Sequence, residues 1–437
     1  MAEAVSDVLS AGVVELAYSP SGTRPPVALD PSTASARGAG PEGWDLTVTV
    51  RLDLKIPVLQ RGHEPLAEVL AALPGVGLAT ADEYRPLRAA GDPSPLSAPL
   101  RRAMRDSIAA GILTRYLEAR IDDAPSPGLV SDTVEFLVEL ASTRVESHDL
   151  THGVVVTDRI HDSPRLSFAY PAQIRAAKRA PLLFDGQRSV LVVDEKGRAR
   201  TELQRHRADR FGLAGGASVP RGSVEMVESG SLVAFASSAL GGLGLYLRTD
   251  RSIWTFVDGQ PLLVRRGEHW RAFPFELGAS LTRLIGDSPA AGLVTRAAFL
   301  ISAQPLGAIL AIVDDASDLD GIVPAKDRFD LRDEIDPLAM RTETRLHHLI
   351  DTEDLDERTI ARLAGLDGAT IVDRHGELLA YGAIVSSSES QHEGARTAAA
   401  RTLSEVALVV LKVSVDGDIT VFRGGTAVAT LLGGTSS

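Results

Sequence analysis

Residues 366–383 read LDGATIVDRHGELLAYGA, in which two apolar runs flank a short polar segment. The first run ends at Asp373, and the second extends from Leu378 to Ala383. Between them, Arg374-His375-Gly376 has the polar and glycine residues that are typical of a tight turn. These residues predict a β-hairpin, and the pattern on either side of it decides the fold class.

Helix and strand patterns alternate on both sides of this hairpin. Before it, GLVTRAAFLISAQ (292–304) has helical spacing, and GAILAIVDD (307–315) has the composition of a buried strand. After it, a helix follows from residue 394, and VALVVLKVSVDGDITVFRGG (406–425) predicts a closing hairpin. Such alternation is typical of an α/β domain with a mixed central sheet flanked by helices, which we assign to residues 286–437.

The first two thirds of the chain divide into two predicted regions. Residues 1–140 combine an alternating strand pattern, LTVTVRLDL (46–54), with helical spacing over 100–121, which predicts an α+β region. Within it, residues 19–44 are dense in proline, glycine, serine and alanine and are predicted to be a loop or linker. Residues 141–285 are rich in strand patterns. The fold class is therefore expected to be α/β, or α+β for the chain overall.

The strand-rich region contains an echo of the hairpin motif. Phe184-Asp185-Gly186 with LVVDEKG (191–197) resembles Leu366-Asp367-Gly368 with TIVDRHG (370–376). Two explanations stay open: a diverged internal duplication, or chance, because Asp-Gly turns are common beside valine-rich strands. The aromatic residues of the region are expected to pack in its core rather than to form a stacking platform for a base; they are Trp254, Phe256 and Trp270.

The composition excludes several classes of function. The chain has 437 residues, of which 44% are hydrophobic, enough for more than one core. Its net charge of -13 argues against a protein that follows a nucleic-acid backbone, because such proteins concentrate Lys and Arg. The lack of cysteine excludes disulfides and thiolate metal sites. No apolar run approaches the ~20 residues of a membrane helix, so we expect a cytoplasmic protein without membrane contacts.

Two short motifs have the chemistry of a nucleotide site. Asp367 precedes Gly368 and Ala369 at a strand start, where a carboxylate can hold a divalent cation or a ribose hydroxyl beside small residues that admit a nucleotide. Gly394 opens a helix, whose free N–H groups and positive dipole end favour phosphate, and Arg396 would add paired hydrogen bonds. We therefore predict that polyphosphate binds at residue 394.

Each motif also has a plainer structural interpretation. Asp-Gly pairs occur in addition at Asp185, Asp258 and Asp416, where a simple turn is expected. Gly394 is equally compatible with close packing of the helix, and a lone arginine is usually exposed to solvent. The joint order of the motifs, rather than any one of them, indicates a nucleotide site.

In order and spacing, these motifs resemble the diadenylate cyclase (DAC) domain family over residues 286–432. Asp367-Gly368-Ala369 is similar to the family's Asp-Gly-Ala motif, and the residues from Gly394 to Ala398 are similar to its Gly-Thr-Arg-His-Arg motif. The resemblance implies that the domains associate as a homo-oligomer. It also implies that Asp367 binds Mg²⁺ or Mn²⁺ and activates a ribose hydroxyl, if the chain is an active cyclase. The nucleotide-binding residues that it implies are Asp367, Gly368, Ala369, Gly394, Arg396, Thr397, Ser404 and Glu405.

This chain departs from the family at the phosphate motif. Ala395 stands where the family has threonine, Thr397 where it has histidine, and Ala398 where the commoner branch has a second arginine. Removal of one such donor commonly slows phosphoryl transfer about a hundredfold or more. We therefore expect a nucleotide-binding protein that retains the pocket and has lost most of the reaction.

Three functions remain open. The first is a sensor that binds ATP, a related nucleotide or a cyclic dinucleotide and reports through the N-terminal region. The second is an active diadenylate cyclase that makes cyclic di-AMP from two ATP molecules. The third is a scaffold that binds no ligand, which an apolar or blocked environment around Asp367 would favour.

Overall fold

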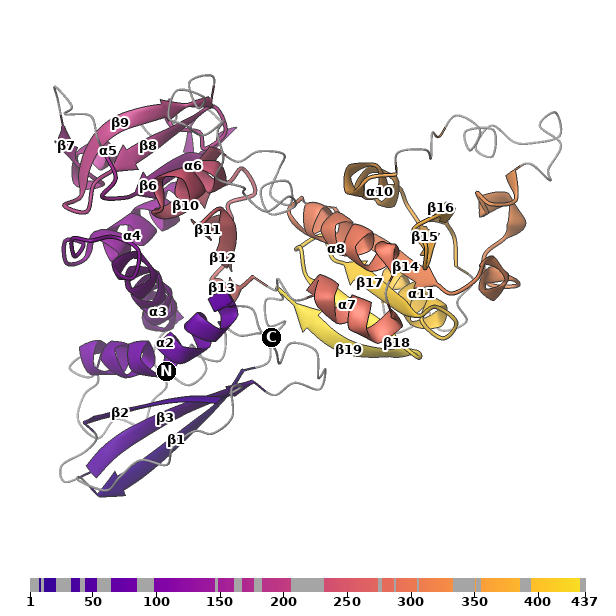
Figure 1. Cartoon of the computed structure of the whole chain (residues 1–437), viewed down its shortest axis with the longest axis horizontal. Coiled ribbons are helices and arrows are strands. Elements are labelled where there is room, and N and C mark those ends of the chain that lie inside the picture. Colours follow the sequence, from indigo (N-terminus) through magenta and orange to yellow (C-terminus); the bar gives the residue numbers. More distant parts are fainter. Residues whose placement is uncertain are drawn as a thin grey trace. The chain divides into compact units, whose positions relative to one another are not determined.

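The structure of the protein is a computed structural model (Figure 1). The described residues form two compact units, of which the first ends at Phe273 and the second contains the residues that follow. Each described helix is too short or too polar to cross a membrane. The structure describes residues 8, 12–20, 33–39, 44–52, 64–84, 98–145, 148–160, 167–176, 183–205, 232–273, 277–286, 288–304, 306–332, 350, 355–385 and 394–432.

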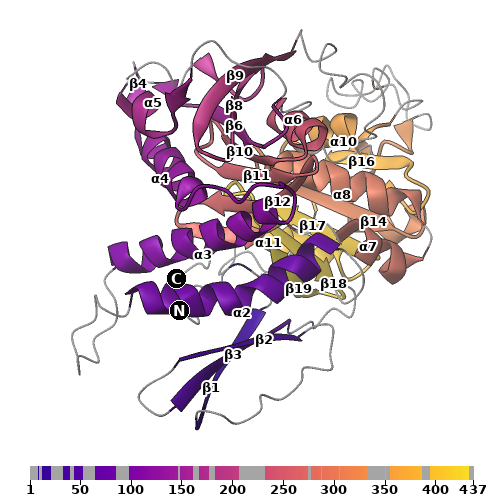
Figure 2. The same ribbon diagram turned by 60° about the vertical axis from the view of Figure 1, so that its left-hand side comes forward.

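A small antiparallel sheet begins the first unit, with strands β1 (Gly12–Pro20), β3 (Trp44–Leu52) and β2 (Thr33–Ala39) in that order. Helix α2 (Glu64–Tyr84) packs against β2 and β3, between the sheet and helix α3 (Figure 2). The prediction of a loop over 19–44 is wrong for residues 33–39, which form β2, and for residues 19–20 and 44, which belong to β1 and β3. Residues 21–32 and 40–43 lie outside the described part. Ala34 and Ala36 alternate with polar residues and pack on the core, a strand signal that the glycine, proline and serine content hides.

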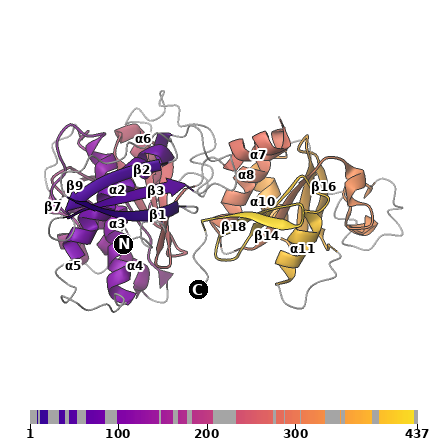
Figure 3. The same cartoon turned by 90° about the horizontal axis from the view of Figure 1, so that it is seen from below.

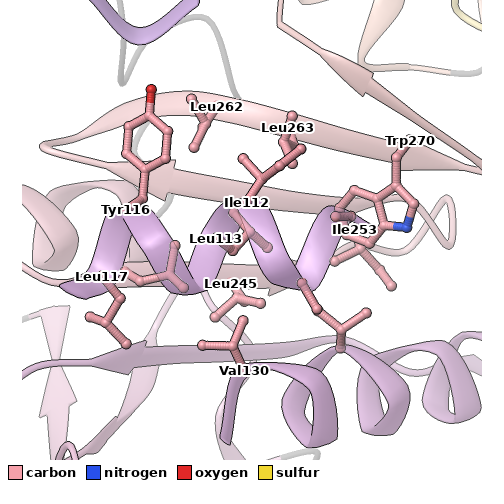
Figure 4. Packing of buried hydrophobic residues seen from close by; sticks show 14 of the residues in the cluster. Ile112, Leu113, Tyr116, Leu117, Val130, Leu245, Ile253, Leu262, Leu263 and Trp270 are labelled. Atoms are coloured by element: carbon pink, nitrogen blue, oxygen red, sulfur yellow. The ribbon is translucent and has the colours of Figure 1, made fainter. Parts of the chain in front are cut away.

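One hydrophobic core extends through the first unit. Helices α3 (Ala98–Glu118) and α4 (Leu129–Ser142) contact each other, and both contact the large sheet described next. Figure 4 shows Ile112 and Leu113 of α3 beside Leu245 and Leu263 of that sheet. The boundary predicted between residues 140 and 141 therefore falls inside a single core, because these helices cover strands that come later in the chain.

The large sheet has the order β13-β12-β11-β10-β6-β8-β9-β7. β6 and β8 run parallel, and the other described neighbours run antiparallel. Trp254, Phe256 and Trp270 are at most 1% exposed, which confirms that they are core residues. The elements of this part are β4 (Arg144–Val145), β5 (His148–Asp149), β6 (His152–Val156), β7 (Phe168–Ala169), α5 (Ala172–Ala176), β8 (Ser189–Val193), β9 (Arg198–Gln204), α6 (Leu232–Leu240), β10 (Leu243–Leu247), β11 (Ile253–Val257), β12 (Gln260–Arg266) and β13 (His269–Ala272).

The second unit is a six-stranded sheet with the order β16-β15-β14-β17-β18-β19. β14 and β15 are parallel and the other pairs antiparallel, and helices α8 and α11 lie on opposite faces (Figure 3), which confirms the predicted mixed sheet flanked by helices. The boundary predicted between residues 285 and 286 falls between α7 and α8, which pack together inside this unit. Its elements are α7 (Leu277–Ile285), α8 (Pro289–Ser302), β14 (Ala308–Val313), η4 (Ala316–Leu319), η5 (Ala325–Asp327), α10 (Glu357–Ala364), β15 (Ala369–Asp373), β16 (Leu378–Ala383), α11 (Ala395–Leu403), β17 (Val409–Val413), β18 (Ile419–Arg423) and β19 (Thr426–Leu431).

The hairpin predicted from residues 366–383 is formed by β15 and β16. Oδ1 of Asp373 accepts hydrogen bonds from the backbone N–H groups of His375 and Glu377, each 2.8 Å long. Gly376 has a φ of 89°, in the left-handed region that favours glycine. The turn chemistry read from the sequence is therefore the chemistry that closes the hairpin.

The same strand connectivity occurs in both units. The order β9-β8-β6-β10-β11-β12 matches the order β16-β15-β14-β17-β18-β19, and β6–β8 corresponds to the parallel pair β14–β15. The register also matches, because Leu243 pairs with Val156 where Val409 pairs with Ile312. The echo between residues 191–197 and 370–376 falls on the corresponding hairpins β8–β9 and β15–β16.

Corresponding turns share their backbone geometry. Asp258 and Gly424 begin equivalent hairpin turns with φ values of 51° and 53°. Ser237 and Ser404 each donate to the carbonyl three residues earlier and accept from a backbone N–H of that turn. The two units therefore contain two versions of one arrangement of strands and turns.

Candidate functional site

Candidate residues gather at one end of the second unit's sheet, where the parallel strands β14 and β15 begin. We call this end of the sheet the edge. β14 starts at Ala308 and β15 at Ala369, so Gly307 and Asp367 precede two neighbouring strands. Helix α11 starts at Ala395 and packs on β14 and β17. Strand register and helix packing together place the two predicted motifs at one edge.

Arg396 and Asp367 are neighbours at this edge. Nη2 of Arg396 lies 3.9 Å from Oδ1 of Asp367, and the two side chains remain 47% and 91% exposed. Such a loose, hydrated ion pair contributes little to stability. Gly307 makes room for the guanidinium, since a β-carbon at position 307 would lie 2.6 Å from Nη1 of Arg396. Both charged groups are therefore accessible to a ligand.

Among the described residues, no side chain caps the first turn of α11. Gly394 is the N-cap residue and provides no side-chain hydrogen bond to the first amides. These amides carry the positive end of the helix dipole, which favours an anion. A β-carbon at Gly394 would meet no described atom within 4 Å, so close packing does not explain this glycine.

Lys412 is a second cation at this edge, and sequence analysis missed it. Lys412 pairs with Ile309 across β17 and β14, and its Nζ donates a 2.9 Å hydrogen bond to Oγ1 of Thr397 in the first turn of α11. It forms no ion pair with any residue that the structure describes. The available signal was one charged residue inside the otherwise apolar strand Val409–Val413.

Gly368 and Ala369 have structural roles. Gly368 has a φ of 112°, and a β-carbon there would overlap the carbonyl group of Gly382 on β16. Ala369 is fully buried, in a core cluster that also contains Ala400 and Leu403 of α11. The close approach of β15 and β16 and the packing of α11 therefore account for the small residues that the sequence analysis assigns to nucleotide access.

Ser404 and Glu405 lie at the other end of α11. A helix of nine residues is about 13 Å long, so these two residues are far from Gly394. Oγ of Ser404 donates to the carbonyl of Arg401 and accepts from the N–H of Gly425, at 2.7 and 3.0 Å. Ser404 and Glu405 therefore lie away from this edge. Of the six predicted residues at it, Gly368 and Ala369 have structural roles, which leaves Asp367, Gly394, Arg396 and Thr397 as candidates for ligand contact.

Three exposed apolar side chains border the charged pair. Leu306 precedes β14, Leu366 precedes β15, and Ile384 follows the antiparallel strand β16. They are 38%, 50% and 57% exposed, respectively. Large apolar side chains at one edge beside opposite charges suit a ligand that has both an apolar and an anionic part.

A divalent cation would find one exposed carboxylate here. Within the part of the chain that the structure describes, no three His, Asp or Glu side chains are grouped closely enough to hold a metal. At nucleotide sites, Mg²⁺ commonly uses one or two carboxylates, and phosphate oxygens and water complete its shell. Asp367 therefore fits a cation that is held mainly by the phosphates of a ligand.

Comparisons with known proteins found neither a matching family model nor a similar curated protein.

Proposed function

We propose that the second unit binds a nucleotide through its phosphates and acts as a sensor domain similar to the DAC domain, with little or no cyclase turnover. The observation that carries this proposal is the position of Arg396. Its guanidinium lies at the uncapped start of α11 and 3.9 Å from the exposed carboxylate of Asp367. A cation, free backbone amides and a carboxylate are the groups that phosphate and a phosphate-bound metal require.

The chemistry of each group follows from its place. Arg396 would donate paired hydrogen bonds to phosphate oxygens, and the first amides of α11 would donate to the same group. The apolar border formed by Leu306, Leu366 and Ile384 would contact the nucleoside. Bound Mg²⁺ or Mn²⁺ would neutralise phosphate charge, with Asp367 as its protein ligand.

Calorimetric titration of the full chain with ATP and with cyclic di-AMP tests the proposal. We expect a Kd between about 1 μM and 1 mM. Arg396→Met should abolish the heat of binding, whereas Arg401→Met, which removes an arginine from the last turn of the same helix, should not. A folded protein that gives no heat with either ligand would leave the scaffold as the remaining function.

An active diadenylate cyclase is the second candidate. The observation that favours it is the exposure of Asp367, which leaves the carboxylate free to meet a ribose hydroxyl. This function also requires two domains that face each other, so we propose self-association of the chain. Incubation with ATP and Mn²⁺ or Mg²⁺, followed by mass spectrometry of the products, separates the two candidates. Robust formation of cyclic di-AMP would overturn the sensor proposal.

A further inference from the structure

Tyr246 and Lys412 occupy the same place in the two units. Tyr246 lies on β10 and pairs with Gly153 of β6, and Lys412 lies on β17 and pairs with Ile309 of β14. Both strands lie between the first parallel strand and the next hairpin of their sheets. The side chains at this position can therefore be compared directly.

In the first unit, protein atoms fill the space at this position, so we call it closed. Tyr246 is 1% exposed, and its ring lies so close to Gly186 that a β-carbon at position 186 would overlap it. The carbonyl of Gly186 also accepts a 2.9 Å hydrogen bond from the N–H of Leu232, the first residue of α6. A protein turn and an aromatic ring thus fill the space beside the strand.

Strand register places Arg188 of the first unit at the position of Asp367, and Asp185 lies three residues earlier. Oδ1 of Asp185 accepts hydrogen bonds of 2.6 to 3.2 Å from the backbone N–H groups of the following residues Gln187, Arg188 and Ser189. Asp367, in contrast, is 91% exposed. The Asp-Gly pair of the first unit therefore stabilises its own turn, and that of the second unit presents its carboxylate to solvent.

In the second unit, the same position holds a charged side chain that is only partly buried. The stem of Lys412 is partly buried, and its ammonium group reaches Thr397, next to Arg396 in the chain. Among the residues that the structure describes, no carboxylate pairs with this ammonium group, and a partly buried ammonium group gains free energy when an anion binds to it. Both cations come from the first turn of α11 or contact it, and two cations at one end of a sheet favour a ligand with more than one negative charge over a single phosphate.

We propose that Lys412 is a phosphate-binding residue that selects polyphosphate ligands, and that the chain binds one such ligand, in the second unit alone. Tyr246 closes the equivalent place in the first unit. This inference rests on the proposed nucleotide site, and it adds the charge class and the stoichiometry of the ligand.

Calorimetry with inorganic tripolyphosphate and with monophosphate tests the inference in the full chain. Wild type should bind one tripolyphosphate per chain, more tightly than monophosphate. Lys412→Met should weaken tripolyphosphate binding about ten- to a hundredfold, and Lys412→Arg should restore most of it. Lys196→Met, which removes an exposed lysine from the first unit, is the matched control and should bind like wild type. Urea unfolding shows whether each variant is folded.

The outcomes separate this inference from the proposed function. If wild type binds tripolyphosphate and Lys412→Met binds equally well, Lys412 is not a ligand residue, while the nucleotide site stands. Two ligands per chain would show that Tyr246 does not close the first unit. Failure of wild type to bind either tripolyphosphate or ATP would overturn both proposals.

Discussion

The guanidinium of Arg396 lies 3.9 Å from the carboxylate of Asp367, although 29 positions in the sequence separate the two residues. One precedes a strand and the other begins a helix, and the sheet brings both to the same edge. Because the contact is exposed, the fold depends little on it, and its charges can be changed without loss of structure.

Asp367→Asn should separate two effects of the carboxylate. Its removal takes negative charge away from the phosphate, so tripolyphosphate affinity in EDTA should stay equal or rise a few-fold. In Mg²⁺, wild type should gain affinity for ATP and the variant should not, because the metal would lose its protein ligand. The free energy of unfolding, measured by urea denaturation, should change by less than about 0.5 kcal/mol. Glu377→Gln removes the same charge from the turn between β15 and β16 and should change none of these quantities.

Gly368→Ala should destabilise the second unit. The residue has a φ of 112°, and the added methyl would overlap the backbone of Gly382, so we expect a loss of about 2 kcal/mol or more. Gly394→Ala is the matched control, because Gly394 has a φ of -57° and open space around it, and its cost should stay below about 1 kcal/mol. If chemical denaturation showed that both variants lose the same free energy of unfolding, the structural role of Gly368 would be contradicted.

Ser404→Ala should weaken the fold and leave ligand binding intact. Loss of the hydroxyl leaves the N–H of Gly425 without its acceptor, which costs about 1–2 kcal/mol. Ser237→Ala should have a similar effect in the first unit, where the N–H of Gly259 loses the same partner. If Ser404→Ala lowered nucleotide affinity without lowering stability, Ser404 would be a binding residue after all.

Ala398→Arg, which would restore the second arginine of the cyclase motif, should destabilise the protein. Ala398 is 4% exposed, so Ala398→Arg would force a guanidinium into the packing of α11, at a cost of several kcal/mol. The exposed neighbour Ala395 should accept Ala395→Thr without such a loss. Thermal unfolding of the two single variants measures the difference, and a stable Ala398→Arg protein would show that the helix can move.

The sequence predicts the core of the second unit well because its signals are local. The hairpin of β15 and β16, the strand β14 and the start of α11 each follow from a few adjacent residues. The meeting of Asp367 with Arg396 also follows, since strand starts and a helix start share one edge. The strand β2 was missed because alanine is a weak strand former and its segment is rich in turn residues.

The remaining part of the site depends on register and length, which single residues do not reveal. Lys412 is a ligand candidate only because β17 pairs with β14 and turns this side chain toward α11. Ser404 and Glu405 are excluded from the edge because the nine residues of α11 separate them from Gly394. The contact between Tyr246 and Gly186 joins residues 60 positions apart, a distance over which periodicity carries no information.

The matching strand order of the two units has a consequence for how the chain folds. A strand from one unit has nearly the right length and hydrogen-bonding pattern to enter the sheet of the other, and misassembly between domains is a characteristic failure of multidomain chains. If β17 took the place of β10, the ammonium of Lys412 would be buried against Gly153 and Gly186 without an anion, at a large free-energy cost. The charge at residue 412 would therefore disfavour this exchanged arrangement.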